Sequence, residues 1–280
     1  GATWNNVGTN AASYVCPPCT IADNGAQFRC VVSNTAGDAT SNIATLTVNA
    51  IPGPSPQGYW KFSEGTGSTT ADFSGNGNNG SIVGAAWTTG RVGPALDFQT
   101  GDAHVAVPAG SSLDFATNRM TVACWVYPSS TTAGWSTIIQ RSNAAGTWMD
   151  WQIYAKANDA PTAGRPVFRF DWDGDRRLDA DEQVQADIAL ATNTWQFIAC
   201  TYDGAALRFY IDGVLRGTTN KTGGIIPAST KPIWIGANDI WGEPYRGRID
   251  EVRLFNQALT QTEIQSLMAV PNTASITINR

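Results

Sequence analysis

A run of acidic residues carries the clearest chemistry in this sequence. Over the twelve positions 171–182, carboxylates occupy the first, third, fifth, ninth and twelfth places, which are Asp171, Asp173, Asp175, Asp179 and Glu182. Ca²⁺ prefers about six to eight oxygen ligands, and a glutamate at the twelfth place can supply two of them. Arg177, at the seventh place, would contribute only its backbone carbonyl. The spacing therefore predicts a calcium-binding loop.

The loop departs in two ways from the EF-hand pattern that it resembles. Its sixth residue is Arg176, where that pattern has glycine, and the preceding residues 166–170 alternate like a strand rather than a helix. We therefore expect a calcium loop set between β elements. The alternative is a solvated acidic hairpin tip, although five carboxylates so close together would repel one another without a counter-ion.

Composition narrows the class of protein. The chain has 280 residues with 28 Gly, 14 Pro and only 15% charged residues, a profile typical of a β protein with many turns. Its net charge of −5 and the lack of a basic cluster argue against nucleic acid and anionic membrane surfaces as partners. No apolar run is long enough for a membrane span. Five cysteines and few lysines favour an oxidising, secreted or cell-surface setting.

Sequence patterns divide the chain into four segments. Residues 1–50 alternate like short strands, 51–58 form a Pro-rich linker, 59–268 carry a long all-β pattern, and 269–280 form a linker that enters one further strand. A capping box at Thr260 and Glu263 predicts one short helix over 260–268. The segments at the two ends favour a piece of a longer protein.

Residues 23–37 resemble the second half of a bacterial immunoglobulin-like domain. In that family a cysteine placed like Cys30 usually pairs with one on an earlier strand, and the sequence offers no such strands. Half a sandwich cannot bury its inner face alone. The missing strands would therefore come from another chain, or the segment is a fragment.

The segment 59–268 resembles a laminin-G-like, concanavalin A-like lectin domain. The matching stretches follow the family order across nearly all of the segment, at residues 59–67, 72–80, 95–98, 195–204, 207–213 and 247–259. The resemblance implies an all-β fold, a two-sheet antiparallel jelly-roll sandwich. The partial immunoglobulin-like β segment would precede it at the N-terminus.

Related families imply two further features. Residues 121–126 and 197–201 resemble the strands that pentraxins join by a disulfide, which implies a Cys124–Cys200 bond; two buried free thiols are the alternative. The lectin family often holds a structural Ca²⁺, and Asp72, Asn78 and Asp250 stand at the implied ligand positions. A loop of Asx-turns that needs no ion is the alternative there.

The sequence offers no evident catalytic constellation. His104 is the only histidine, so a His-based triad or a zinc site has no partners in register. Asp250 and Glu251 would point to opposite faces of a strand. We therefore expect a non-catalytic domain, although the parent protein could carry an enzyme domain elsewhere. A hydrolase would need a cleft with paired carboxylates.

Binding chemistry is better represented, because the chain has 11 tryptophans and sugars stack their C–H faces on indole rings. Trp148, Trp151 and Trp241 stand next to turns and form the best candidate platform, with Asp239 and Arg246 as polar partners. For any single tryptophan, packing in the core is the more common role.

These features predict an extracellular, calcium-binding, lectin-like module that binds a glycan or cell-surface polysaccharide within a larger bacterial secreted or surface protein. The alternative is a structural adhesin or filament subunit. In that case the partial immunoglobulin-like segment of one copy and the last strand of another would complete each other by strand addition.

Overall fold

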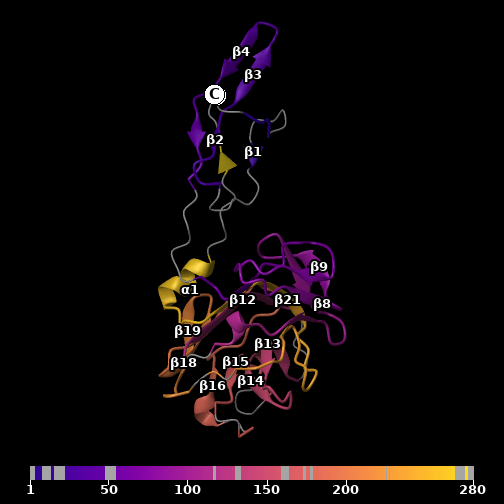
Figure 1. The fold of residues 1–280 in the computed structure, drawn as a ribbon, viewed down its shortest axis with the longest axis vertical. Helices are drawn as coiled ribbons and strands as arrows, with labels where there is room; N and C mark the ends of the chain where they lie inside the picture. The colour runs from indigo at the N-terminus through magenta and orange to yellow at the C-terminus, as the bar shows by residue number, and fades with distance from the viewer. Residues whose placement is uncertain are drawn as a thin grey trace. The chain divides into compact units, whose positions relative to one another are not determined.

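The structure is a computed structural model that describes residues 4–7, 14–15, 23–47, 55–115, 118–129, 134–158, 164–172, 175–176, 179–224, 226, 228–268 and 275–276. The chain forms two compact units (Figure 1). The smaller unit consists of Gly1–Pro52 together with Ala269–Arg280, and the larger unit is Gly53–Met268. The larger unit carries the candidate site.

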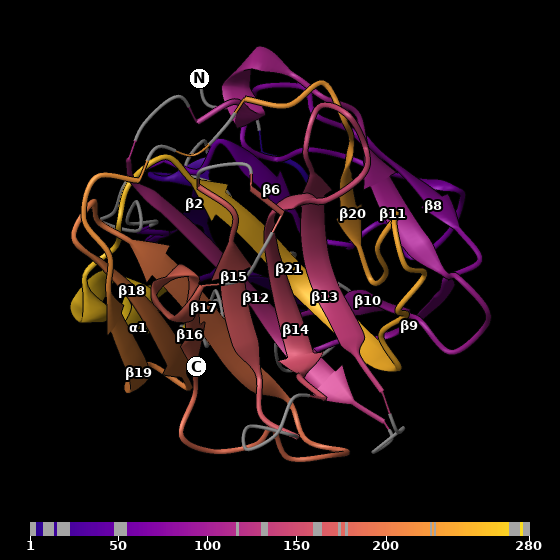
Figure 2. The same cartoon turned by 90° about the horizontal axis from the view of Figure 1, so that it is seen from below.

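The larger unit is a sandwich of two antiparallel sheets, which Figure 2 shows one in front of the other. The back sheet has the order β19 (Val214–Asn220), β18 (Ala206–Ile211), β17 (Gln196–Tyr202), β12 (Met120–Pro128), β21 (Gly247–Phe255), β10 (Pro94–Asp97) and β9 (Ala86–Thr89), with β6 (Gly58–Trp60) also paired to β21. The front sheet has the order β16 (Gln183–Gln185), β15 (Val167–Phe170), β14 (Met149–Lys156), β13 (Ser136–Ser142), β20 (Ile233–Ile235), β11 (His104–Val107), β8 (Gly80–Val83) and β7 (Thr69–Thr70). The predicted all-β, two-sheet jelly-roll fold is confirmed.

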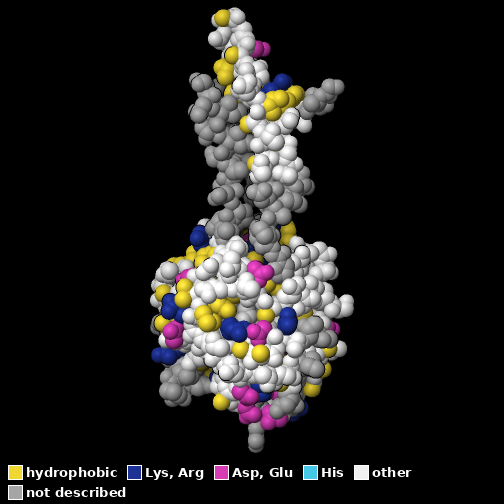
Figure 3. All heavy atoms as spheres, turned by 90° about the vertical axis from the view of Figure 1, so that its left-hand side faces the viewer, with side chains coloured by type: hydrophobic (Ala, Val, Ile, Leu, Met, Phe, Trp, Pro, Cys, Tyr) yellow, Lys and Arg dark blue, Asp and Glu magenta, His cyan; other side chains and the backbone are white. Residues whose placement is uncertain are grey.

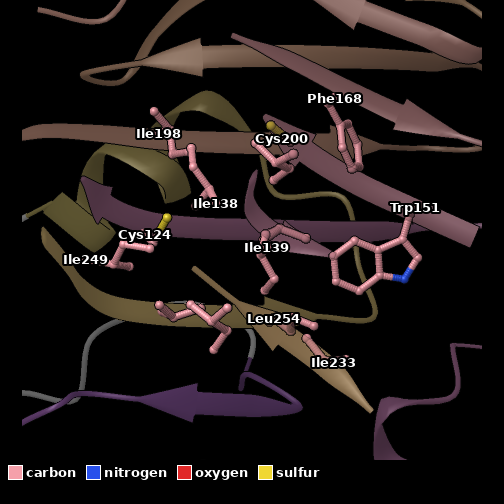
Figure 4. Packing of buried hydrophobic residues seen from close by; sticks show 14 of the residues in the cluster. Cys124, Ile138, Ile139, Trp151, Phe168, Ile198, Cys200, Ile233, Ile249 and Leu254 are labelled. Atoms are coloured by element: carbon pink, nitrogen blue, oxygen red, sulfur yellow. The ribbon is translucent and has the colours of Figure 1, made fainter. Parts of the chain in front are cut away.

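The main hydrophobic core fills the space between the sheets. Trp151 and Ile153 of β14, together with Cys124 and Val126 of β12, belong to one buried cluster (Figure 4). Fully burying an aliphatic or aromatic side chain of this kind stabilises the fold by roughly 1.5–3 kcal/mol. Because side chains alternate along a strand, the other residues of β14 point away from this core. These residues form part of the outer face of the front sheet.

The expected disulfide is not formed, because Cys124 and Cys200 are both buried free thiols. In the register of β12 and β17, Cys124 lies opposite Ile198 and Cys200 lies opposite Val122, so the cysteines are diagonal neighbours. Diagonal positions on paired strands stand about 7–8 Å apart, whereas a disulfide needs Cβ atoms about 3.5–4.5 Å apart. Figure 4 shows the two sulfur atoms apart on their separate strands.

The helix α1 (Gln261–Met268) covers part of the outer face of the back sheet. Thr260 Oγ1 accepts the Glu263 N–H at 3.3 Å and Glu263 Oε2 accepts the Thr260 N–H at 2.7 Å, which completes the predicted capping box. Ile264 of this helix joins Trp125 of β12 in a second buried apolar cluster. Among the residues described, no helix is long and apolar enough to cross a membrane.

The smaller unit contains three two-stranded sheets within its described residues. They pair β2 (Gln27–Phe28) with β5 (Ala44–Thr45), β3 (Val31–Asn34) with β4 (Gly37–Thr40), and β1 (Tyr14–Val15) with β22 (Ser275–Ile276). The strand expected after the last linker therefore pairs with the N-terminal segment of its own chain.

Candidate functional site

A polar row crosses the outer face of the front sheet. Strand register places the members of this row opposite one another in turn: Gln183 of β16, Arg169 of β15, Gln152 of β14, Gln140 of β13 and Trp234 of β20. Apolar neighbours of these residues along each strand belong to the core cluster, so the row itself faces outward. The row is therefore fixed by backbone pairing and presents amide and indole groups on one surface.

Several polar atoms on or beside this face are buried without a hydrogen-bond partner. The acceptors are Gln140 Oε1, Gln152 Oε1 and Asp150 Oδ2, and the donors are the indole Nε1 atoms of Trp148 and Trp234. The three acceptor residues are only 0%, 1% and 4% exposed, respectively. An unpaired buried polar group costs about 1–3 kcal/mol. Five of the ten unpaired buried polar atoms among the described residues therefore lie on or beside this one face.

Trp148 and Trp241 meet beside the polar row. Their rings form a T-shaped pair with centroids 5.2 Å apart, and Trp241 is 41% exposed. Asn238 fixes the turn that carries Trp241, because its Oδ1 accepts the backbone N–H groups of residues 240–242. The next residue, Asp239, accepts hydrogen bonds from Gln140 Nε2 at 3.3 Å and from the Ser142 hydroxyl. Three of the five predicted ligand residues, Trp148, Trp241 and Asp239, therefore lie together.

The other two predicted ligand residues lie elsewhere. Trp151 is 1% exposed and packs in the core, because alternation along β14 turns it away from the face that carries Asp150. Arg246 donates to the Gly101 carbonyl at 3.0 Å and lines a separate cavity of about 160 Å³ together with Tyr245. Neither residue belongs to the tryptophan pair.

The acidic loop begins where β15 ends. Asp171 is 3% exposed, and Glu182 is 1% exposed. The Glu182 carboxylate accepts the Trp172 N–H and the Asp179 N–H, both at 3.3 Å, so one carboxylate joins the start and the end of the loop. Asp179 caps the short 3₁₀ helix η3 (Ala180–Glu182) in return. Figure 3 shows acidic side chains gathered at the end of the sandwich where this helix lies in Figure 1.

Four of the six predicted ligands of the loop site, Asp171, Asp175, Asp179 and Glu182, lie among the described residues. Asp175 is exposed, and Asp173 and Arg177 lie outside the described residues. Among the residues that the structure describes, no group of three or more His, Cys, Asp or Glu side chains is arranged to hold a metal ion.

Sequence reasoning missed a pair of carboxylates that the register creates. Asp171 donates its backbone N–H to the Asp150 carbonyl at 3.1 Å, next to the Trp151–Phe170 pair, so Asp150 and Asp171 stand opposite each other on neighbouring strands. Burial raises the pKa of Asp150 to about 7; the charge of Arg141 lowers it and that of Asp171 raises it. The alternation on β14 could have assigned Asp150 to the polar face, but its partner depends on strand pairing.

The second predicted calcium site is divided between two networks. Asp72 accepts N–H groups from Tyr59, Ser74 and Asn78, each at 2.9 Å, and a further bond from Asn78 Nδ2 at 2.9 Å. These donors lower the pKa of Asp72 although burial raises it, and they satisfy the carboxylate without a cation. Asp250 instead accepts the N–H groups of Arg91 at 2.8 Å and Val92 at 2.9 Å. Asp72 and Asn78 therefore belong to one hydrogen-bond network and Asp250 to another, and the Asx-turn alternative accounts for the donors around Asp72.

Comparison with known families identifies the fold family. Residues 99–265, more than half of the chain, match the model of the concanavalin A-like lectin/glucanases superfamily. The chain therefore belongs to this superfamily, as the lectin-like resemblance predicted. No curated protein matches the chain significantly.

Solved structures share the sandwich. Domain 4 of AbnA, a GH43 extracellular arabinanase from Geobacillus stearothermophilus, in complex with arabinotriose, is 21% identical with a TM-score of 0.52, over 76% of this chain and 98% of that domain. The binding domain of Paraclostridial Mosquitocidal Protein 1 is 16% identical with a TM-score of 0.60, over 76% of this chain and 51% of that one. A Trypanosoma rangeli sialidase in complex with the inhibitor DANA is 17% identical with a TM-score of 0.57, over 78% of this chain and 33% of the sialidase. At these identities the likeness establishes the fold alone.

Proposed function

We propose that the larger unit is a glycan-binding module whose binding face is the outer surface of the front sheet. The observation that carries this proposal is the set of buried, unpaired polar atoms beside the exposed Trp241. A sugar hydroxyl both donates and accepts hydrogen bonds, so its chemistry matches the unpaired acceptors Gln140 Oε1 and Gln152 Oε1 and the unpaired Trp148 indole N–H. Trp241 adds an aromatic surface for the C–H face of a sugar ring.

The arabinanase domain supports a saccharide as the ligand class. That domain is in complex with arabinotriose, and the chain spans 98% of its length. By contrast, the chain spans about half of the toxin binding domain and a third of the sialidase. Of these three structures, the arabinanase domain is the one that this chain covers over nearly its whole length.

Calorimetric titration with a panel of neutral oligosaccharides, arabinan fragments included, tests the binding face. We expect saturable binding that Trp241→Ala weakens by about tenfold, equivalent to about 1.4 kcal/mol. Phe73→Ala is the matched control, because Phe73 is also an exposed aromatic residue but packs against Tyr59 of β6. Equal losses in both variants, or no binding across the panel, would refute the proposed face.

We further propose that the 171–182 loop binds Ca²⁺ and that the module is a non-catalytic part of a larger bacterial secreted or cell-surface protein. The carboxylate spacing and the buried Glu182 support the metal. Calcium titration of chelator-treated protein, repeated with Asp173→Ala and Asp175→Ala combined, tests it: the double variant should lose binding. Hydrolysis of any polysaccharide in the panel would contradict the non-catalytic role and direct attention to Asp150 and Asp171.

Assembly of copies as an adhesin or filament is the second candidate. Its support is the β3–β4 hairpin, on which Val31 and Val32 are 51% and 44% exposed on opposite faces. The pairing of β22 with β1 of the same chain leaves this proposal with less support. A particle mass that rises with protein concentration, measured by sedimentation, would favour assembly, whereas a constant monomer mass would exclude it.

A further inference from the structure

We propose that Asp150 and Asp171 jointly bind a Ca²⁺ ion, so that the cation site extends from the acidic loop onto the neighbouring strand β14. This inference rests on the proposed calcium loop and deepens it. Asp150 lies outside the twelve-residue motif of positions 171–182, and no spacing rule assigns it to the site. Only the pairing of β14 with β15 brings the two carboxylates to the same place.

The register of the strands makes the geometry suitable. Trp151 lies opposite Phe170, and the N–H of Asp171 bonds to the Asp150 carbonyl at 3.1 Å, which sets the two aspartates face to face. Opposed side chains on antiparallel strands have Cβ atoms about 4.5–5.5 Å apart. Two carboxylate oxygens separated by up to about 5 Å can each lie about 2.3–2.6 Å from one Ca²⁺.

The side chain of Asp150 provides a second observation, independent of the loop motif, that points to a bound cation. Its side chain is 4% exposed, and its Oδ2 has no hydrogen-bond partner. Asp171, opposite, is 3% exposed, so the two acids are buried together rather than spread over a solvated surface. A divalent cation between the two carboxylates would give the unpaired Oδ2 a partner and offset the repulsion between the two acids.

The proposed ion would lie beside the glycan-binding face. Asp150 and Gln152 are two positions apart on β14 and therefore share its outer face. Water would supply further ligands, since Ca²⁺ takes about six to eight oxygens. The ion would thus link the acidic loop to the strand that carries the unpaired Gln152 Oε1.

Terbium luminescence is the sharpest test, because Tb³⁺ replaces Ca²⁺ and is sensitised by nearby indole rings. Trp172 is adjacent to Asp171 in the chain, and Trp148 is two residues before Asp150. Chelator-treated protein is titrated with Tb³⁺, and the signal is then displaced with Ca²⁺. We expect Asp150→Asn to weaken both steps by about tenfold or more. Asp187→Asn, at a side chain that is 64% exposed, is the matched control and should leave them unchanged.

The outcomes separate this inference from the loop proposal. Binding that is lost in Asp173→Ala/Asp175→Ala but unchanged in Asp150→Asn would overturn the inference and keep the loop. Binding weakened by Asp150→Asn and also by the loop substitutions would support both. Weakening by Asp150→Asn alone would support the cross-strand pair and reject the loop motif, and no binding by the wild type would reject both. A thermal melt of Asp150→Asn without metal shows whether the variant is folded, and Asp171→Asn repeats the test from the other strand.

Discussion

The outer faces of the two sheets contrast sharply. On the back sheet, helix α1 supplies Ile264 to an apolar cluster with Trp125 and Phe197, so the chain covers this face with its own residues. On the front sheet, the corresponding surface carries Gln140 and Gln152, whose Oε1 atoms are buried without partners. The back face is thus covered by the chain's own apolar side chains, although Oδ1 of Asp250, opposite Trp125 in the strand register, is also buried without a partner. The front face instead carries polar side chains, which is the composition that the proposed binding role requires.

Two buried aspartates, one in each sheet, share the same perturbation. Burial raises the pKa of Asp250 in the back sheet to about 7, and its Oδ2 accepts the N–H groups of Arg91 and Val92 and holds that turn. Burial also raises the pKa of Asp150 in the front sheet to about 7. Each aspartate keeps one buried oxygen without a hydrogen-bond partner, Oδ1 of Asp250 and Oδ2 of Asp150.

The largest expected change in stability comes from a cavity in the apolar cluster between helix α1 and the back sheet. Ile264→Ala removes a fully buried side chain from the cluster under α1 and should lower the free energy of unfolding by about 2–5 kcal/mol. Glycan affinity of the folded protein should not change, because the substitution lies on the opposite sheet. Chemical denaturation and calorimetric titration of the same sample measure both quantities. A loss of affinity as large as the loss of stability would show that the two faces are not independent.

The buried carboxyl of Asp250 should give the stability of the fold a pH dependence that an exposed carboxylate does not give. The folded pKa of Asp250, about 7, lies above its ordinary value of 3.8, so the fold favours the protonated carboxyl. Its stabilising contribution is full below about pH 4 and is lost as pH rises through about 7. We expect the melting temperature of the chelator-treated protein to fall between about pH 5 and pH 8. Asp250→Asn, which stays neutral, should remove the part of that fall that comes from Asp250 and leave the part that comes from Asp150, whereas the exposed Asp187→Asn should reproduce the wild-type curve.

A substitution on the outer face of the front sheet should change glycan affinity and leave stability nearly unchanged, which is the reverse of the result expected for Ile264→Ala. Gln152→Leu replaces a buried amide with an unpaired acceptor by an apolar side chain of similar size, so stability should change by less than about 1 kcal/mol. Glycan affinity should fall by about tenfold, because a sugar hydroxyl loses its acceptor. Calorimetry with the best oligosaccharide of the panel measures the loss. Unchanged affinity would remove Gln152 from the binding face.

The fold was predictable because its signals are local or periodic. Ordered strand and turn patterns over 59–268 predicted the sandwich, and Thr260 with Glu263 predicted α1 because a capping box is contained within one turn. The disulfide prediction was wrong because it depended on a diagonal rather than an opposed position, and sequence patterns do not specify register.

The site was predictable only where neighbours in sequence are neighbours in space. Asp239 and Trp241 lie in one turn held by Asn238, and their closeness follows from the chain itself. Trp151 was misplaced although the alternation with Asp150 and Gln152 already assigned it to the core side of β14. The pairing of Asp150 with Asp171 could not be predicted in the same way, because it depends on how β14 and β15 align.

The smallest expected effect tests the helix that closes the back face. Thr260→Ala removes the Oγ1 that accepts the Glu263 N–H at 3.3 Å and should cost about 1 kcal/mol of stability. Urea denaturation should show a lower midpoint with an unchanged slope, since the surface exposed on unfolding is the same. Thr260→Ser, which keeps a hydroxyl at the cap, should restore most of the loss. If Thr260→Ala instead changed glycan affinity and left the midpoint alone, α1 would act on the front sheet through the core, and the division between a packing face and a binding face would have to be abandoned.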